Sequence, residues 1–273
     1  MGGSKTATAV AAADVTLATE PLVALLREIA EDSDGLVQLR PGLSDARMDA
    51  WAAPVPEEIR VLLRAVGGIR IAFGRRKDDG TYLFSEIDFD ESLNDGTFPL
   101  GGDGSWYVEQ AGGPGTHRFV HLDSGDGFVY VDVDRETGAW GPVFIFWDAN
   151  DTARLDSSLH AWLHRTAVCL RDALRDADGN PHAFSSAFSG SWTDHHTNVP
   201  QVPTIPAAEA RTSPDPVIRS VATALPDDGA LADLREVDGA ALVIFDFPEL
   251  CHFGRAHGGA VLTAVPTNPY EDD

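Results

Sequence analysis

The sequence predicts an α+β protein in which helical segments flank one long run of strands. Three observations support this fold class. Apolar residues recur every three to four positions at both ends of the first 180 residues, which indicates amphipathic helices. Between about 70 and 148 the apolar period falls close to two, with turn residues between the runs, which indicates strands. The chain has 273 residues, 43% of them apolar, so it is long enough to bury a substantial core.

Three helices are predicted before the strands. The first spans about 20–31, where four apolar side chains fall at positions i, i+3, i+4 and i+7. A short helix is expected at 45–52. The strongest stripe runs over 56–66 and is expected to end at Gly67 and Gly68, because paired glycines stop a helix.

The middle of the chain is predicted to form strands and then a long helix. The predicted strands cover residues 69–73, 81–89, 105–109, 117–122, 127–134 and 142–147. Val129, Val131 and Val133 alternate with polar residues, which predicts one buried and one solvated face. A helix with a long apolar stripe is expected over 157–178.

The chain is predicted to have four parts. Residues 1–18 are expected to be a disordered leader, and residues 19–178 the main domain. Residues 179–213 are rich in Pro and Ser and lack periodicity, which predicts a linker or strap. Its apolar residues favour a strap lying against the first domain. Residues 214–273 are expected to form a small α/β extension. Its expected elements are a helix at 215–224 and strands near 229–235, 240–247 and 259–265.

The charge is strongly negative and uneven. The chain has 20 Lys and Arg against 43 Asp and Glu, a net charge of −23. Residues 78–136 alone contain 14 acidic and two basic residues, a net −12. This balance argues against direct nucleic-acid binding, which needs a basic surface. No apolar run reaches the ~18 residues of a membrane helix. Two cysteines, Cys169 and Cys251, make no disulfide framework, which fits a cytoplasmic protein.

Several residue groups were considered as metal or catalytic sites. His182, Asp194, His195 and His196 offer ligands for a metal ion, but adjacent histidines point in opposite directions in most backbones. The carboxylates around 123–136 lack the ligand spacing of a calcium loop. Loop histidines and a solvated acidic strand face are therefore the favoured interpretations.

The remaining motifs also favour structural roles. Cys251 and His252 lie beside a strand in apolar company, so a buried structural cysteine is favoured over a nucleophile, as it is for Cys169. The glycine-rich segments lack the strand and helix context of a phosphate-binding loop. We therefore expect no catalytic residue, no cofactor and no metal.

The order of several motifs is more distinctive. Pro54–Ile69 has the pattern P-x-P-E-E-I-R-V-L-L-R-A-V-G-G-I. Strand-like segments follow, containing Gly127–Asp132 and then Trp147-Asp148, and a capped helix containing Ser158–Leu163 comes after them. Over residues 20–178 the chain thus resembles the SUKH superfamily, the Smi1/Knr4-like domains. The insertion at 90–116 and the C-terminal sixty residues depart from the simplest members.

The resemblance implies an SMI1/KNR4-like fold, with a mainly antiparallel sheet and helices largely on one side, and no catalysis. It also implies an immunity-type protein that neutralises a cognate polymorphic toxin, often a nuclease or deaminase. The alternatives are a regulatory or scaffold protein and, more remotely, a metal-dependent enzyme. An acidic surface suits a basic toxin. The expected partner-binding residues are Asp88, Asp90, Glu91, Asp95, Asp123, Asp126, Asp132, Asp134 and Glu136.

Overall fold

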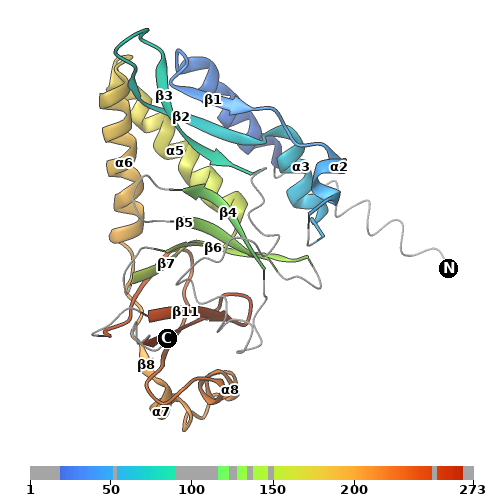
Figure 1. Ribbon diagram of the computed structural model, residues 1–273, viewed down its shortest axis with the longest axis vertical. Coiled ribbons are helices and arrows are strands. Elements are labelled where there is room, and N and C mark those ends of the chain that lie inside the picture. Colours follow the sequence, from blue (N-terminus) through green and yellow to red (C-terminus); the bar gives the residue numbers. More distant parts are fainter. Residues whose placement is uncertain are drawn as a thin grey trace, which may run out of the picture.

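The protein is built on one eight-stranded antiparallel sheet (Figure 1). The computed structural model describes residues 19–51, 54–89, 116–122, 128–133, 138–146, 151–247 and 251–266. The strand order β1-β2-β3-β4-β5-β6-β7-β10 is a meander of seven strands completed by one strand from the C-terminal part. The strands are β1 (Val37–Arg40), β2 (Gly68–Arg75), β3 (Tyr82–Asp88), β4 (Thr116–Leu122), β5 (Phe128–Val133), β6 (Trp140–Phe146), β7 (Asp151–Asp156) and β10 (Ala241–Ile244). The fold is thus α+β.

Helices cover one face of this sheet and enclose the main core. They are a helix over residues 19–32, α2 (Asp45–Asp49), α3 (Glu57–Ala65), α5 (Leu159–Ala177) and α6 (Pro181–Thr197). Leu26, Leu63, Val131, Trp162 and Phe184 come from different elements and are all almost fully buried in this one core. Figure 1 shows α5 and α6 side by side along the sheet. No helix among the described residues is long and apolar enough to cross a membrane.

A second, four-stranded antiparallel sheet lies against the opposite face of the main sheet. Its order is β11-β12-β9-β8, and its elements are β8 (Ile205–Pro206), β9 (Ala230–Asp233), β11 (Cys251–Ala256) and β12 (Val261–Pro266), with helices α7 (Ala207–Ala210) and α8 (Pro216–Ala224). Phe144 of β6 and Val243 of β10 form a core with Leu262 of β12. Ile218 and Val221 of α8 form another core with Leu231 of β9. The C-terminal part therefore both extends the main sheet and builds a second layer.

The structure differs from the sequence prediction over residues 179–213. Instead of a linker or strap without periodicity, residues Pro181–Thr197 form helix α6. The Asn180 side chain caps it by accepting hydrogen bonds from the backbone N–H groups of His182 and Ala183. Phe184 is fully buried, and Phe188 and Trp192 pack against the same core at helical spacing. Tertiary burial of this stripe outweighs the low helix propensity of the four Ser residues and one Gly residue of α6.

Helix α3 ends just before Gly67 and Gly68, as the sequence predicts. The reason for the two glycines is the close packing of β1, β2 and β3 at this point. Val66 is the extended C-terminal cap of α3. A Cβ atom at Gly67 would lie 2.1 Å from the carbonyl oxygen of Pro41, and one at Gly68 would lie 2.5 Å from that of Ile87. Because these obstacles are backbone atoms, only glycine lets β1 and β3 approach the start of β2.

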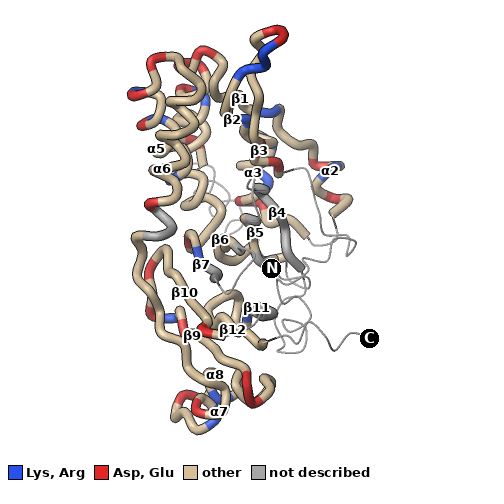
Figure 2. The backbone as a smooth tube through the Cα atoms, turned by 60° about the vertical axis from the view of Figure 1, so that its left-hand side comes forward, with Lys and Arg blue, Asp and Glu red and all other residues tan. Residues whose placement is uncertain are grey.

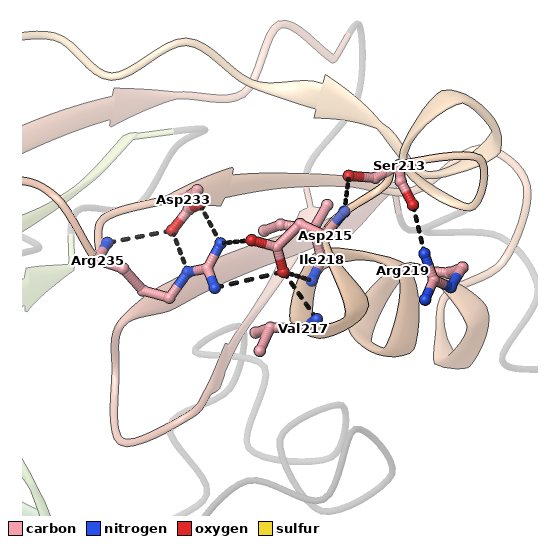
Figure 3. Close-up of polar contacts among 7 residues, drawn as sticks. All are labelled: Ser213, Asp215, Val217, Ile218, Arg219, Asp233 and Arg235. Carbon is pink, nitrogen blue, oxygen red and sulfur yellow. Dashed lines mark hydrogen bonds and ion pairs between the residues drawn. The ribbon is translucent and has the colours of Figure 1, made fainter.

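An exposed ion-pair network connects two elements of the second layer (Figure 3). Arg235 donates to both oxygens of Asp233, at 2.9 and 2.6 Å, and to Asp215 at 2.6 and 3.3 Å. Asp215 also caps α8, because its carboxylate accepts the N–H groups of Val217 at 2.8 Å and Ile218 at 3.3 Å. The Arg235 guanidinium lowers the pKa of both carboxyls. The network links β9 to the start of α8.

We expect this network to lose its stabilising effect in acid. The folded-state pKa values of Asp215 and Asp233 lie below the ordinary value of 3.8, so the unfolded chain takes up these protons first as pH falls. The stabilisation is complete above the ordinary value and disappears as pH falls through the lowered values. Urea unfolding of wild type and Arg235→Met at about pH 6 and about pH 3 should show a smaller pH dependence for the variant.

The control for the acid experiment is Arg175→Met, which removes an exposed pair with Asp172 on α5. This control should keep the pH dependence of the wild type, because neither its pair nor its helix touches the Arg235 network. An identical pH profile for wild type and Arg235→Met would contradict the assignment.

Candidate functional site

The structure describes few of the residues predicted to bind a partner. Asp88 lies at the end of β3, and Asp132 lies on β5, paired in register with His117 of β4. The others lie outside the described residues: Asp90, Glu91, Asp95, Asp123, Asp126, Asp134 and Glu136. The geometry of the site is therefore built around Asp88 and the strands beside it.

Asp88 belongs to a row of polar side chains on the sheet face that points away from the helices. The strand register places Gly68 between Arg40 and Asp88, and Arg70 between Gln38 and Glu86. Side chains in the same register position on neighbouring strands lie on one face. We call this surface the β1–β3 face; it consists of Gln38, Arg40, Arg70, Arg75, Tyr82, Phe84, Glu86 and Asp88.

The carboxylates of the β1–β3 face already have arginine partners. Arg40 pairs with Asp88, whose side chain is only 14% exposed, and lies 3.5 Å from a Glu86 oxygen. Arg70 donates to Glu86 at 2.9 Å and to the amide oxygen of Gln38 at 3.2 Å. Asp88 is thus a neutralised, mostly buried group, and its carboxylate is less available to a partner than the sequence suggested.

Aromatic side chains continue the face toward the tip of the β2–β3 hairpin. The guanidinium of Arg70 lies 4.2 Å from the ring centre of Phe84, and that of Arg75 lies 4.5 Å from the ring centre of Tyr82. Arg75 also donates to the Tyr82 hydroxyl at 2.9 Å. These contacts fix the arginines in place, so the face combines preset arginines with half-exposed aromatic rings. This face was not predicted from the sequence; the only signal for it there is that Arg and aromatic residues recur within positions 70–84.

Charges of both signs lie close together at the hairpin tip. Arg75, Arg76 and Lys77 are followed directly by Asp78 and Asp79, all exposed. Figure 2 shows this alternation at the tip beyond β2 and β3. Asp79 accepts hydrogen bonds from the N–H and the hydroxyl of Thr81, at 2.9 and 2.6 Å, which lower its pKa. The described part of this surface is therefore mixed in charge.

The residues considered as metal ligands are not brought together. His182 and Asp194 are exposed on α6, and twelve positions along one helix separate them by about 18 Å. The side chains of His195 and His196 lie outside the described residues. In the described part of the chain, no three His, Cys, Asp or Glu side chains gather as a metal site.

Cys169 has the structural surroundings that its position on the helix suggested. It is buried on α5, and the Ser191 hydroxyl of α6 donates to its sulfur at 3.4 Å. Burial raises the pKa of the Cys169 thiol, which disfavours the reactive thiolate. The side chains of Cys251 and His252 on β11 lie outside the described residues.

Two shallow depressions lie on the helical side of the molecule. One, of about 230 Å³, is lined by Glu28, Ile29, Asp32, Arg171, Leu174 and Arg175. The other, of about 370 Å³, lies between the helix of residues 19–32 and α3 and is lined by Thr19, Glu20, Val23, Ala24, Arg27, Val61 and Ala65. Neither contains a pair of groups arranged as nucleophile and base.

Comparison with protein-family models found no match, and comparisons with curated proteins and with solved structures found none either. The function of the chain therefore has to be argued from its charge, its order of elements and the geometry of the β1–β3 face.

Proposed function

We propose that this chain is a cytoplasmic, non-enzymatic immunity-type protein of the SUKH superfamily that binds and neutralises a cognate polymorphic toxin. The proposed partner is a basic nuclease or deaminase, and the chain itself does not contact nucleic acid. The observation that carries the proposal is the net charge of −12 over residues 78–136, a stretch that includes three strands of the main sheet, β3, β4 and β5.

The charge argument rests on how a basic enzyme meets an acidic surface. A nuclease needs cationic groups to hold phosphates, so its substrate-binding surface is complementary to clustered carboxylates. Carboxylates near one another repel in the free protein, and a partner's arginines relieve that repulsion when they bind. Mounting the carboxylates on a packed sheet reduces the conformational entropy lost on binding. An acidic protein of this kind can block the toxin by occupying its substrate site.

The order of elements is compatible with the resemblance. In chain order, the protein forms the helix of residues 19–32, then β1, α2 and α3, which ends just before Gly67-Gly68. The strands β2 to β7 and the helix α5, capped by Ser158, come after them. The Ser158 hydroxyl accepts the N–H of Ala161 at 3.2 Å, as the capped-helix motif requires. The close strand packing at Gly67-Gly68 gives a physical reason for the double glycine of the motif.

The β1–β3 face refines which carboxylates we expect to matter. Asp88 is held by Arg40, so a basic partner has to displace an internal arginine to reach it. The free energy lost by breaking the Arg40–Asp88 ion pair offsets most of the free energy gained from a new ion pair between Asp88 and the partner. We therefore expect Asp88 to contribute less than the carboxylates of 123–136, and Arg40 and Arg70 to act mainly by holding the face rigid.

Co-expression with the product of the adjacent upstream gene tests the proposal. If that product is a polymorphic toxin, this chain should restore growth of cells that express it and should co-purify with it in a fixed ratio. An adjacent gene without a toxin domain, together with no protection on co-expression, would exclude the immunity function.

The second candidate is a regulatory or scaffold protein without a toxin partner. The C-terminal layer favours it, because that layer adds a second sheet and a strand of the main sheet to the part that resembles the family. The same co-expression experiment distinguishes the two candidate functions. A stoichiometric complex with a toxic nuclease would rule out the scaffold, and capture of a non-toxic partner alone would favour it.

A further inference from the structure

A β-bulge in strand β2 places a large aromatic side chain at the surface. The register of β2 with β3 shifts between Ala72 and Gly74, so Phe73 is an extra residue without an opposite residue on β3. Ile69 and Ile71 are buried, whereas Phe73, the next residue in this alternation, is 44% exposed. A bulge changes the direction of a side chain in this way at the cost of a regular ladder. The bulge of β2 thus keeps an apolar ring in contact with solvent.

Phe73 lies on the same side of the sheet as the β1–β3 face. A Cβ atom at Gly74 would lie 3.3 Å from Cε1 of His182 on α6, so Gly74 faces the helices. Because successive side chains of a strand alternate, Phe73 and Arg75 face the opposite side. The contact of the Arg75 guanidinium with the ring of Tyr82 agrees with this placement. Phe73 therefore adds an exposed ring to the hairpin end of the β1–β3 face.

The tip of the same hairpin carries a concentration of positive charge (Figure 2). Arg75, Arg76 and Lys77 are the only three consecutive basic residues in the chain, and all three are exposed. Among the described residues, none of them pairs with a carboxylate, and the neighbouring Asp79 accepts hydrogen bonds from Thr81 instead. The N–H of Arg76 donates to the carbonyl oxygen of Thr81 at 2.8 Å and closes the turn. The hairpin thus presents three unpaired cations on a preformed turn.

We infer that Phe73, Tyr82 and the cations of residues 75–77 form a docking surface, the hairpin surface, for an acidic peptide segment of a protein partner. Carboxylates of the segment pair with the cations, and an aromatic or aliphatic side chain beside them packs on Phe73. Arginine and aromatic residues are the side chains that are enriched in protein interfaces. This surface is separate from the carboxylates proposed to bind a toxin, and it does not depend on that function.

A single-stranded nucleic acid is the competing ligand, because it also binds to cations and aromatic rings. On this hairpin, however, the guanidinium of Arg75 already lies over the ring of Tyr82, and that of Arg70 over the ring of Phe84. The net charge of −23 also repels a polyanion. For a short peptide segment, screening over about 8 Å at physiological salt limits this repulsion. The surface therefore favours an acidic peptide.

Fluorescence anisotropy of labelled probes titrated with the full chain tests the hairpin surface. The expected ligand is a short peptide of Glu and Phe. The comparison probes are a peptide with Ala in place of Phe, a peptide with Lys in place of Glu, and a short single-stranded DNA. The Glu/Phe peptide should bind most tightly, and either change in the peptide should weaken binding about tenfold. Tighter binding of the DNA, equal binding of the Lys/Phe peptide, or no saturable binding of the Glu/Phe peptide would overturn the proposal.

A matched pair of variants tests the aromatic part of the surface. Phe73→Ala should weaken binding of the Glu/Phe peptide at least about fivefold, because a central apolar contact is lost. Ile244→Ala removes another large apolar side chain, which is 38% exposed on β10, and should bind the peptide like the wild type. Equal affinities of Phe73→Ala and Ile244→Ala for the peptide would contradict the role of Phe73.

A second matched pair tests the cationic part. Arg76→Gln/Lys77→Gln should weaken binding of the Glu/Phe peptide about three- to tenfold and reduce its salt dependence, because two exposed ion pairs are lost. Arg27→Gln/Arg171→Gln changes the net charge equally through exposed arginines on the helical side and should bind within about twofold of the wild type. An equal loss in both double variants would show that only net charge matters and would exclude a docking surface at the hairpin. Circular dichroism checks that each variant is folded.

Discussion

Replacement of Arg154 by methionine is expected to lower the free energy of unfolding by about 3–5 kcal/mol. Arg154 lies on β7 and is 6% exposed. Its Nε donates to the carbonyl oxygen of Gly239 at 2.7 Å, its Nη1 to that of Leu234 at 3.3 Å, and its Nη2 to that of Val237. Methionine fills similar space but removes the arginine donor from the carbonyls of Gly239 and Val237, while that of Leu234 still accepts from the N–H of Val237 at 3.2 Å.

The loss of stability in Arg154→Met should be concentrated in the C-terminal part of the chain. The three carbonyls belong to the connection between β9 and β10, and β10 pairs directly with β7, where Arg154 lies opposite Ala241. Arg154 therefore fastens the second layer to the main sheet. Hydrogen exchange should become faster for the N–H groups of β10 than for those of β5 and β6, and urea unfolding gives the total loss.

The control for this result is Arg175→Met, whose side chain is 67% exposed and pairs with Asp172 one turn earlier. An exposed pair contributes little, so we expect a change below about 0.5 kcal/mol. A similarly small change for Arg154→Met would show that water satisfies the carbonyls of Gly239 and Val237 and that the second layer is held by its apolar core alone.

The elements that sequence analysis located best are those with one strong apolar stripe. The helix of residues 19–32, α3 and α5 each bury a continuous face, so a single pattern determines both their type and their position. The alternation of Val129, Val131 and Val133 correctly indicated a strand with one buried face, because all three are buried in the main core. In these segments local pattern and tertiary environment agree.

Other elements depend on distant parts of the chain. Strand β1 has only four residues, and its partner β2 determines that it is a strand. Strand β11 likewise depends on its pairing with β12. Strand β7, over Asp151–Asp156, was missed because its sequence D-T-A-R-L-D contains a buried arginine, which only the carbonyls near Gly239 can satisfy. The sequence predicts a strap in place of helix α6 because the stripe of Phe184, Phe188 and Trp192 is interrupted by many small polar residues.

The candidate site was only partly accessible to sequence reasoning. Composition identifies an acidic stretch, but only the register of β1, β2 and β3 shows that Arg40 neutralises Asp88 and that Arg70 neutralises Glu86.

Neutralising four carboxylates of the acidic stretch is expected to weaken toxin binding strongly. The variant has Asn in place of Asp123, Asp126, Asp132 and Asp134. We expect Asp132 and Asp134 to lie at the centre of the interface. Each of these two should cost about 2–5 kcal/mol of binding free energy, mostly through faster dissociation, because close desolvated charge pairs control the off-rate. The first two, at the rim, should mainly slow association and reduce its salt dependence. Stopped-flow association and dissociation rates at two salt concentrations separate these effects.

The matched control removes the same charge from elsewhere on the molecule. Glu20, Glu28, Asp176 and Asp228 are exposed, and their change to the corresponding amides alters the net charge by the same four units. The control variant should associate with the toxin somewhat more slowly, because its long-range electrostatic attraction is weaker, but it should dissociate at the rate of the wild type. Both variants should stay folded, since Val129, Val131 and Val133 hold β5 in the core whatever the polar side chains beside them. If the Asp→Asn variant binds its toxin with unchanged affinity and unchanged salt dependence, the interface lies elsewhere, on residues 90–116 or the C-terminal part.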